Sequence, residues 1–346
     1  MTGETDDIHA SFSAEVRSVV IYQPFPGLSM SCPMNSQSIK NQSVRVETVS
    51  SDHDGQRLDN FLARHLKGVP KKAIYRMIRT GQVRINSGRC KPDRRVSTGD
   101  QVRIPPARID AHGQVRVSDA VIRQVREAIL FEDADYLVVD KPCGMAVHSG
   151  SHLPWGLIDA IRQGRPDKYV ELAHRLDRET SGCLVLAKNG KALRHLSNLF
   201  RDGEVEKHYL CLMDGQLKED RVTVDEALAR SEDQEERKME VHDEGKDSIT
   251  RFRRLQLLRD STYVEAELLT GRTHQIRAHA AHLGLPLAGD ERYGTDSSLA
   301  RWKKRGLRRL FLHSHHLGFT NAAGDHLTFN APLPDSLRQV LLDLGA

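Results

Sequence analysis

A single carboxylate lies between two arginines in the stretch HRLDRETSG, residues 174–182. The carboxylate is Asp177, and its neighbours are Arg175 and Arg178. An aspartate is ionised at neutral pH, so it can act as a nucleophile, a general base or a stabiliser of positive charge. The simpler interpretation is a turn in which Asp177 caps the chain and pairs with one arginine. The motif alone favours that simpler interpretation.

Two further segments bring other reactive groups. GRTHQIRAH, residues 271–279, contains Arg277, and EKHYLCL, residues 206–212, places Tyr209 in a strand-like run. An acid, an arginine and a phenol are then available to one pocket. We therefore select Asp177, Tyr209 and Arg277 as candidate catalytic residues.

The elements around these residues predict a mixed, mainly antiparallel sheet. Strand-like apolar runs occupy residues 128–131, 136–140, 183–187, 205–213, 250–258 and 262–269. One helix is expected at about residues 191–201, and Gly203 ends it. The candidate residues fall on loops and strand ends, where a rigid framework can present them.

A smaller module precedes this sheet. Apolar residues at helical spacing predict a helix from about Leu58 to Leu66 and a second helix that begins at Pro70, and a two-strand hairpin follows up to Ile104. Four cations share the polar face of the second helix. They are Lys71, Lys72, Arg76 and Arg79.

The positive charge of the chain is concentrated in this module. The whole chain has a net charge of +4, but residues 55–109 hold fourteen Lys and Arg and three Asp, a local net charge of +11. Such asymmetry is typical of a domain that binds the phosphates of nucleic acid. The alternative is a basic surface that only confers solubility, and the gathering of the charges on one helix face argues against it.

Composition restricts the class of protein. The chain has 346 residues, enough for two domains, and no apolar stretch of the length that a membrane span requires. Five cysteines occur without a C-x-x-C pair, and the N-terminus is acidic rather than shaped like a secretory signal. We expect a cytoplasmic protein.

The order of segments gives a domain plan. Residues 1–43 are rich in polar residues and are expected to be disordered, or to come from a reading frame extended upstream of Met34. Residues 55–107 form the basic module, residues 108–124 a polar linker, and residues 125–346 the second domain.

The basic module resembles the S4 RNA-binding domain. The resemblance covers nearly its whole length and includes the passage from Ile78 to Asn86, I-x-x-G-x-V-x-I-N. It implies that the helix pair presents its cations to structured RNA, with contacts governed by shape and backbone.

The second domain resembles the pseudouridine synthases of the RluA family from about residue 128 to residue 337. The matching motifs are V-x-x-KP-x-G-x-x-V-H at 138–148, HRLD-x-x-TSG-x-L-x-x-AK at 174–188, K-x-Y at 207–209, GRTHQIR-x-H at 271–279, GD-x-x-YG at 289–294 and LFLHS at 310–314. The fold implied is α+β, a mainly antiparallel mixed-sheet catalytic domain behind a small S4 domain.

The resemblance also implies an activity. These enzymes break the N1–C1′ bond of a uridine, rotate the uracil and rejoin it through C5, without a cofactor or a metal. Together with the S4 module, the motif set implies uridines of large-subunit (23S) ribosomal RNA as substrate, and we expect a monomer.

The resemblance assigns roles to the candidate residues. Asp177 matches the catalytic aspartate, which attacks the base, attacks the sugar or removes a sugar proton; the sequence leaves these three open. Arg277 matches the arginine that pairs with it and keeps it charged. Tyr209 matches the tyrosine that stacks on uracil and lies near C5. Arg175 matches an arginine that fills the place of the flipped base, and its other interpretation is an ion pair with Glu179.

Two rival functions were weighed. A metal site built from His274, His279 and His282, or from the three histidines of residues 313–316, lacks the spacing of known zinc motifs. A non-catalytic RNA-binding or ribosome-assembly protein would need only the S4 module and the basic residues 301–309. The presence of acid, tyrosine and arginine together argues against it.

Overall fold

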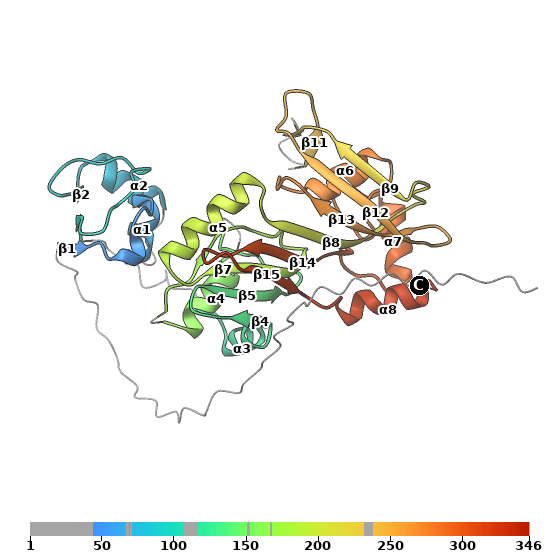
Figure 1. Ribbon diagram of the computed structural model, residues 1–346, viewed down its shortest axis with the longest axis horizontal. Coiled ribbons are helices and arrows are strands. Elements are labelled where there is room, and N and C mark those ends of the chain that lie inside the picture. Colours follow the sequence, from blue (N-terminus) through green and yellow to red (C-terminus); the bar gives the residue numbers. More distant parts are fainter. Residues whose placement is uncertain are drawn as a thin grey trace, which may run out of the picture. The chain divides into compact units, whose positions relative to one another are not determined.

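A computed structural model describes residues 44–66, 69, 71–106, 116–150, 153–166, 168–231 and 238–345, apart from the side chains of Asp52 and Lys71. Figure 1 labels the elements in chain order. The expected disorder or misplaced start at residues 1–43 lies outside the described residues, as does most of the acidic segment 231–237.

The N-terminal module packs two helices on a small sheet. Its elements are β1 (Arg45–Thr48), a 3-10 turn (Ser51–His53), α1 (Leu58–His65), α2 (Lys71–Arg79), β2 (Arg84–Ile85) and β3 (Gln101–Ile104). The strand order is β1-β3-β2, antiparallel throughout. Its core is apolar and includes Phe61, Leu62, Ile74 and Ile78, as the helical spacing predicts. The strand β1, which precedes the predicted module, was missed.

The C-terminal part is built on one long sheet. Its strands are β4 (Ile129–Glu132), β5 (Tyr136–Lys141), β6 (Glu171–Leu172), β7 (Ser181–Ala187), β8 (Glu206–Met213), β9 (Arg221–Asp225), β12 (Ile249–Leu257), β13 (Thr262–Leu268), β14 (Leu312–Thr320) and β15 (His326–Asn330). The order is β4-β5-β7-β14-β8-β13-β12-β9, with β6 beside β7 and β15 beside β14. The β7–β14 pair is parallel and the other pairs are antiparallel, which confirms the predicted α+β class.

A short hairpin stands apart from this sheet. It pairs β10 (Leu228–Arg230) with β11 (Met239–Val241) in antiparallel register. The contacts of β11 with the helix α6 (Gln275–His282) place the hairpin over that helix, as Figure 1 shows.

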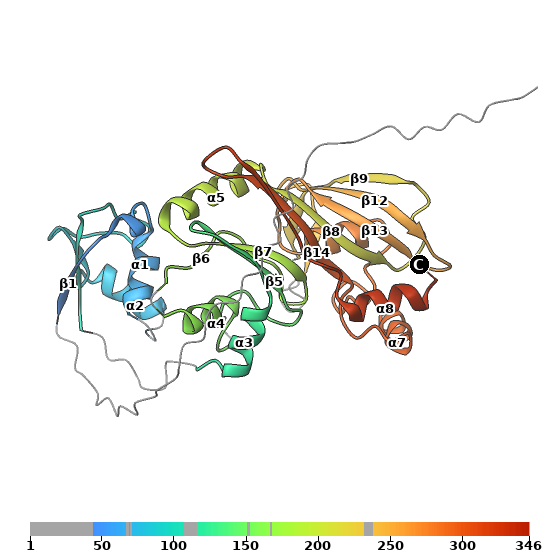
Figure 2. The ribbon, with the colours of Figure 1, turned by 60° about the horizontal axis from the view of Figure 1, so that its bottom comes forward.

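Helices cover both faces of the long sheet. They are α3 (Asp119–Glu127), α4 (Leu157–Gly164), α5 (Gly190–Asp202), α6, α7 (Asp296–Lys304) and α8 (Asp335–Asp343). The helices α3, α4 and α6 share one apolar core with the sheet, whereas α5 packs on the opposite face near β7 and α7 and α8 pack on it beyond β8. Figure 2 shows α5 and the α3–α4 pair on opposite sides of β5 and β7. Every residue of β7 is buried, because both of its faces are covered.

Local sequence explains where α5 begins and ends. The Asn189 side chain accepts a hydrogen bond of 2.9 Å from the Ala192 N–H and caps the first turn. Gly203 adopts φ of +79°, the left-handed conformation in which helices commonly stop. The predicted helix at residues 191–201 is therefore confirmed.

The predicted linker is wrong over its second half. The helix α3 (Asp119–Glu127) overlaps the end of residues 108–124 and begins after Ser118, whose side chain accepts from the Val121 N–H. Val117 and Val125 are buried in the core of the long sheet, and Ile122 packs against it. Charged residues between these apolar positions disguised a helix with one buried face. The linker residues 108–115 lie outside the described part of the chain.

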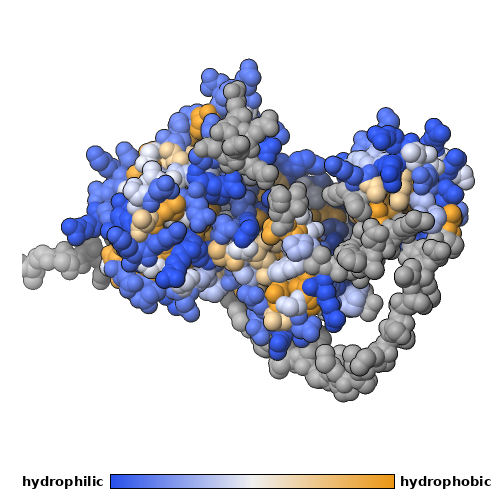
Figure 3. Space-filling model, turned by 180° about the vertical axis from the view of Figure 1, so that it is seen from behind, coloured by the Kyte–Doolittle hydropathy of each residue, from blue (hydrophilic) through white to orange (hydrophobic). Residues whose placement is uncertain are grey.

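The surface around these cores is mostly polar. Figure 3 shows one face on which hydrophilic residues predominate and apolar areas are scattered. In the described part of the chain, no helix combines the length and the apolar character needed to cross a lipid bilayer.

Candidate active site

Asp177 lies on the loop that joins β6 to β7. The Thr180 N–H donates to the Asp177 carbonyl, which closes a turn, and Leu176 is buried beneath it. The side chain of Asp177 is 21% exposed, so its carboxylate can meet a molecule from solvent. The loop therefore buries Leu176 and leaves the carboxylate of Asp177 accessible.

A buried lysine ties this loop to its neighbour. Lys141, at the end of β5, is fully buried, and its ammonium donates to the carbonyls of Pro142, Met145 and Arg178 at 2.9, 2.8 and 3.1 Å. Burial lowers the pKa of Lys141 to about 8. Pro142 and Met145 lie on the loop that follows β5, and Arg178 lies on the loop of Asp177. Lys141 therefore holds these two loops together.

The far end of the loop fits closely against β14. Gly182 adopts φ of +112°, and a Cβ there would lie 2.2 Å from the Ser314 carbonyl oxygen, so only glycine fits. Ser181 lies 2.9 Å from His313 Nδ1 and accepts from the Arg309 guanidinium at 2.7 Å. These contacts give Ser181 and Gly182 structural roles.

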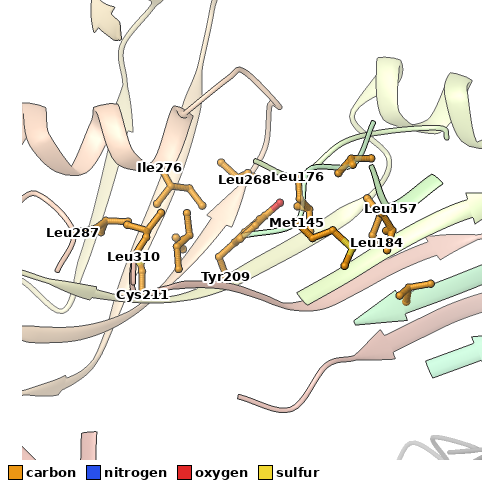
Figure 4. Close-up of a cluster of buried hydrophobic side chains, with 14 of the residues drawn as sticks. Met145, Leu157, Leu176, Leu184, Tyr209, Cys211, Leu268, Ile276, Leu287 and Leu310 are labelled. Carbon is orange, nitrogen blue, oxygen red and sulfur yellow. The ribbon is translucent and has the colours of Figure 1, made fainter. Parts of the chain in front are cut away.

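Tyr209 comes from β8 in the middle of the sheet. Its side chain lies in the apolar core and the residue is 8% exposed. Figure 4 shows its hydroxyl directed toward Leu176, the residue next to Asp177. Burial raises the pKa of the Tyr209 phenol, a hydrogen bond with Ser314 opposes the rise, and the charge of Asp177 adds to it. The phenol is therefore uncharged at neutral pH and close to Asp177.

Arg277 lies on α6 and is 5% exposed. Its Nε and Nη2 both donate to Asp290 at 2.7 Å, and the Asp290 side chain is fully buried. The expectation that the guanidinium of Arg277 pairs with Asp177 is therefore wrong, because its partner is Asp290. Asp177 still lies near enough to raise the pKa of Arg277, after the larger effect of Asp290. The reason is geometric: the fork has two parallel donors, and Asp290 accepts both.

A histidine lies beside Asp177. His274 Nε2 is 3.9 Å from Asp177 Oδ2, a contact that is an ion pair only when the ring is protonated. On the other side of the ring, Nδ1 is 3.3 Å from the hydroxyl of Tyr293. The sequence drew attention to His274 only as a metal ligand.

Arg175 is exposed on the same loop. The partner of Glu179 is Arg178, at 3.3 Å, and not Arg175. The alternative ion-pair interpretation of Arg175 is therefore wrong, and its guanidinium faces solvent.

Two of the other histidines named in the sequence, His279 and His313, belong to the core. His279 is buried between the Thr250 hydroxyl at 2.9 Å and the Glu226 carbonyl at 3.0 Å. His313 is buried, and burial lowers its pKa to about 4. Each ring occupies both of its nitrogens with protein groups.

The cations of the N-terminal module line one helix. Lys72, Arg76 and Arg79 of α2 are exposed, whereas Ile74 and Ile78 of the same helix are buried. The side chain of Lys71 lies outside the described residues. The helix thus separates an apolar face from a basic one.

Comparisons with known proteins identify the family of this chain. Residues 135–282 match the family described as RNA pseudouridylate synthase, and residues 56–102 match the S4 domain. The ribosomal large subunit pseudouridine synthase C of Yersinia pestis is 44% identical over 309 residues, which cover 88% of this chain and 97% of that protein. The protein of the same description from Haemophilus influenzae is 42% identical over 314 residues, 89% of this chain and 98% of its own length.

The chain belongs to the RNA pseudouridylate synthase family.

Solved structures of the family share the fold. The human RNA pseudouridylate synthase domain containing 1 is 30% identical with a TM-score of 0.53, over 61% of this chain and 85% of its own. The human RNA pseudouridylate synthase domain containing 4 is 25% identical with a TM-score of 0.56, over 65% of this chain and 96% of its own. The present synthase is thus an isomerase that makes pseudouridine in RNA, behind an S4 domain.

Several residues of this synthase site were not identified from the sequence. They are His274, Asp290, Tyr293 and Arg309. Asp290 and Tyr293 belong to the GD-x-x-YG motif, and the presence of an acid and a phenol in that motif was the signal that could have drawn attention to them.

Proposed function

We propose that this synthase converts specific uridines of large-subunit (23S) ribosomal RNA to pseudouridine, with Asp177 as the catalytic residue. One observation carries the proposal. The partly exposed Asp177 carboxylate lies 3.9 Å from His274, and near enough to the buried phenol of Tyr209 and the buried guanidinium of Arg277 for its charge to raise the pKa of both groups. The names of the relatives, ribosomal large subunit pseudouridine synthase C, support the choice of RNA.

The reaction follows from these groups. The target nucleotide leaves its stack at a cost of about a few kcal/mol, and the exposed Arg175 fills the vacated place. The ionised Asp177 then acts on the sugar or the base, the N1–C1′ bond breaks, and the uracil rejoins through C5. The uncharged phenol of Tyr209 stacks on the uracil. It passes its own proton to solvent water and takes the C5 proton in its place, so the phenol is again uncharged when C5 has lost its proton.

Arg277 acts in this scheme through position and charge. It is held by Asp290, so its guanidinium cannot swing toward the substrate. Its charge nevertheless favours the ionised form of a carboxylate nearby, which a reacting aspartate requires.

The S4 domain captures the RNA. Lys72, Arg76 and Arg79, together with Lys71, contact the backbone of structured RNA, and shape rather than base sequence guides the contact. We further propose that the enzyme works in the cytoplasm as a monomer without metal or cofactor. Size-exclusion chromatography with light scattering, and activity after dialysis against a chelator, check the last two points.

The test is release of tritium from C5-labelled uridine in ribosomal RNA. Asp177→Asn keeps the shape of the side chain and removes its charge, so we expect loss of at least about 10³-fold in kcat with RNA affinity within about twofold of the native value. Asp335→Asn, at an aspartate whose side chain is 93% exposed, is the matched control and should retain full activity.

Two outcomes would overturn the proposal. If native protein and Asp177→Asn both bind RNA but release tritium only at background, the chain is a non-catalytic RNA-binding or assembly protein. If both are active, another group does the chemistry. The choice of uridines is decided by mapping pseudouridine in ribosomal RNA from cells that lack the gene.

A further inference from the structure

Asp177 needs a partner other than the fork of Arg277. The two donors Nε and Nη2 of Arg277 are taken by Asp290 at 2.7 Å. Among the described residues, the basic group within 4 Å of the Asp177 carboxylate is His274, whose Nε2 lies 3.9 Å from Oδ2. The side chain of His274 is 13% exposed and that of Asp177 is 21% exposed, so both lie at the mouth of the site.

The position of the His274 ring is fixed by its own backbone and by Tyr293. Its backbone has φ of +53°, the left-handed conformation that few residues other than glycine adopt, at the residue that caps α6. The ring of Tyr293 meets it edge to face with centroids 5.9 Å apart. The Tyr293 hydroxyl lies 3.3 Å from Nδ1. A backbone conformation this uncommon, next to a reactive acid, indicates that the ring's position matters for function.

The hydroxyl of Tyr293 has one proton and two possible acceptors for it. It accepts from the Met239 N–H at 2.8 Å, and the Met239 carbonyl lies 3.2 Å away. If the hydroxyl donates to that carbonyl, His274 must donate from Nδ1, and a lone pair on Nε2 then faces Asp177. If the hydroxyl donates to Nδ1, the proton of the neutral imidazole is on Nε2 and points at the carboxylate.

An ionised carboxylate decides between these arrangements. A lone pair directed at Asp177 is repelled, whereas an N–H directed at it is attracted and becomes a charge-assisted hydrogen bond on a small approach. We propose that Tyr293 holds His274 in the tautomer protonated on Nε2, and that His274 is thereby a positioning residue that donates to the Asp177 carboxylate. Its consequence for catalysis rests on the function proposed above.

The charges around the ring favour a neutral imidazole. Burial lowers the pKa of His274, Arg277 lowers it further, and Asp177 opposes both. Arg292 acts in the same direction as Arg277, and Asp290 in the same direction as Asp177. A neutral ring has two tautomers. Whether the Tyr293 hydroxyl donates to Nδ1 therefore determines whether an N–H or a lone pair on Nε2 faces Asp177.

The tautomer is tested directly by nuclear magnetic resonance of the full chain labelled with 15N-histidine. We expect His274 to show a protonated Nε2 and an unprotonated Nδ1 near pH 7.5, and we expect Asp177→Asn to move the Nε2 resonance. A proton on Nδ1, or an Nε2 resonance that Asp177→Asn leaves unmoved, overturns the proposal. This measurement needs no RNA, so it stands even if the chain fails to release tritium and the proposed function is lost.

Kinetics test the positioning role. Tyr293→Phe keeps the ring and removes the hydroxyl, so we expect kcat to fall by about 10-fold with little change in KM. His274→Leu should lower kcat by about 10- to 100-fold, and His274→Gln, which keeps a donor near the place of Nε2, should recover about tenfold of that loss. Both His274 variants bear the same left-handed backbone, so the difference between them reports the donor and not the fold.

Two readouts separate positioning from general damage. The acidic limb of the pH profile of kcat/KM should move to higher pH in His274→Leu and much less in His274→Gln, because the donor favours the ionised acid. His282→Gln, at the exposed end of the same helix, is the matched control and should match the native profile. Equal rates and equal pH profiles for the Leu and Gln variants would overturn the role given to His274.

Discussion

At the scale of single residues, Asp290 is the side chain on which most of the candidate site depends. Its carboxylate accepts two hydrogen bonds from Arg277 and one each from the N–H groups of Arg292 and Tyr293. The two oxygens of Asp290 therefore fix both the guanidinium of Arg277 and the backbone at Arg292 and Tyr293. Both Arg277 and Asp290 are almost completely shielded from water, so neither can exchange its partner for solvent.

Loss of the charge on Asp290 should be costly. Asp290→Asn leaves a buried guanidinium without its counter-charge, and we expect the free energy of unfolding to fall by about 3–5 kcal/mol in urea denaturation. Asp260→Asn is the control, because Asp260 also binds an arginine, Arg305, at 2.6 Å, but with 37% of its side chain exposed. That variant should lose less than about 1 kcal/mol. Equal losses in the two variants would contradict the importance of burial.

The candidate residues differ in how far the sequence could predict them. Asp177 and Tyr209 were selected by type and motif, and the charge of Asp177 contributes to the raised pKa of the Tyr209 phenol. The partner of Arg277 could not be selected, because any carboxylate can satisfy a guanidinium and only the packed chain decides which one arrives. The role of His274 could not be predicted either, because it depends on the 3.9 Å approach of its ring to Asp177, a residue almost a hundred positions earlier.

At the scale of elements, the strand β14 joins the reactive loop to the core. His313 on this strand is buried and lies 2.9 Å from the hydroxyl of Ser181, at the end of the Asp177 loop, and 3.2 Å from the Ala331 carbonyl. Burial lowers the pKa of His313 to about 4 from the value of 6.5 for an unperturbed histidine. The neutral ring is thus part of the native packing.

This strand should make the protein sensitive to acid. The unfolded chain binds a proton at His313 near pH 6.5 and the native chain only near pH 4, so the stability from the neutral ring is complete above pH 6.5 and is lost as the pH falls toward 4. Between pH 7 and pH 5 the loss should be about 2 kcal/mol, and His313→Gln should lack it. Urea denaturation at the two pH values measures this, with His282→Gln as the control. An unchanged pH dependence in His313→Gln would assign the acid sensitivity to other groups.

Elements with a clean apolar pattern were predictable and mixed ones were not. The strands β7 and β13 have apolar or alternating sequences that match their burial. The helix α3 was missed because its apolar residues are separated by Arg123, Gln124 and Arg126, and its buried face becomes evident only against α4. The strand β1 was missed because its short sequence RVET has no clear apolar pattern, and only its pairing with β3 defines it as a strand.

At the scale of the whole molecule, charge and reactive groups lie in different parts of the chain. The segment with a net charge of +11 contains α2, whereas Asp177, Tyr209 and Arg277 lie in the C-terminal part. Affinity for RNA and the rate of the reaction should therefore respond to different substitutions.

A charge-removing variant of α2 tests this separation. Replacing Lys72, Arg76 and Arg79 by Gln should weaken RNA binding and lower the slope of log affinity against log salt by about 2 to 3, with kcat at saturating RNA unchanged. The control removes three exposed cations of the C-terminal part, Lys191 and Arg201 of α5 and Arg338 of α8. It should change the slope by less than 1. Equal slopes for the two variants would contradict the role of α2.

The place of β14 in the sheet also governs how the enzyme can be synthesised. This strand ends at Thr320, near the end of the chain, yet it fills the centre of the sheet between β7 and β8. A nascent chain still attached to a translating ribosome cannot complete the sheet before that late strand emerges, although earlier segments can begin to fold. A product truncated before β14 would thus have Asp177, Tyr209 and Arg277 but would lack the strand that joins β7 to β8.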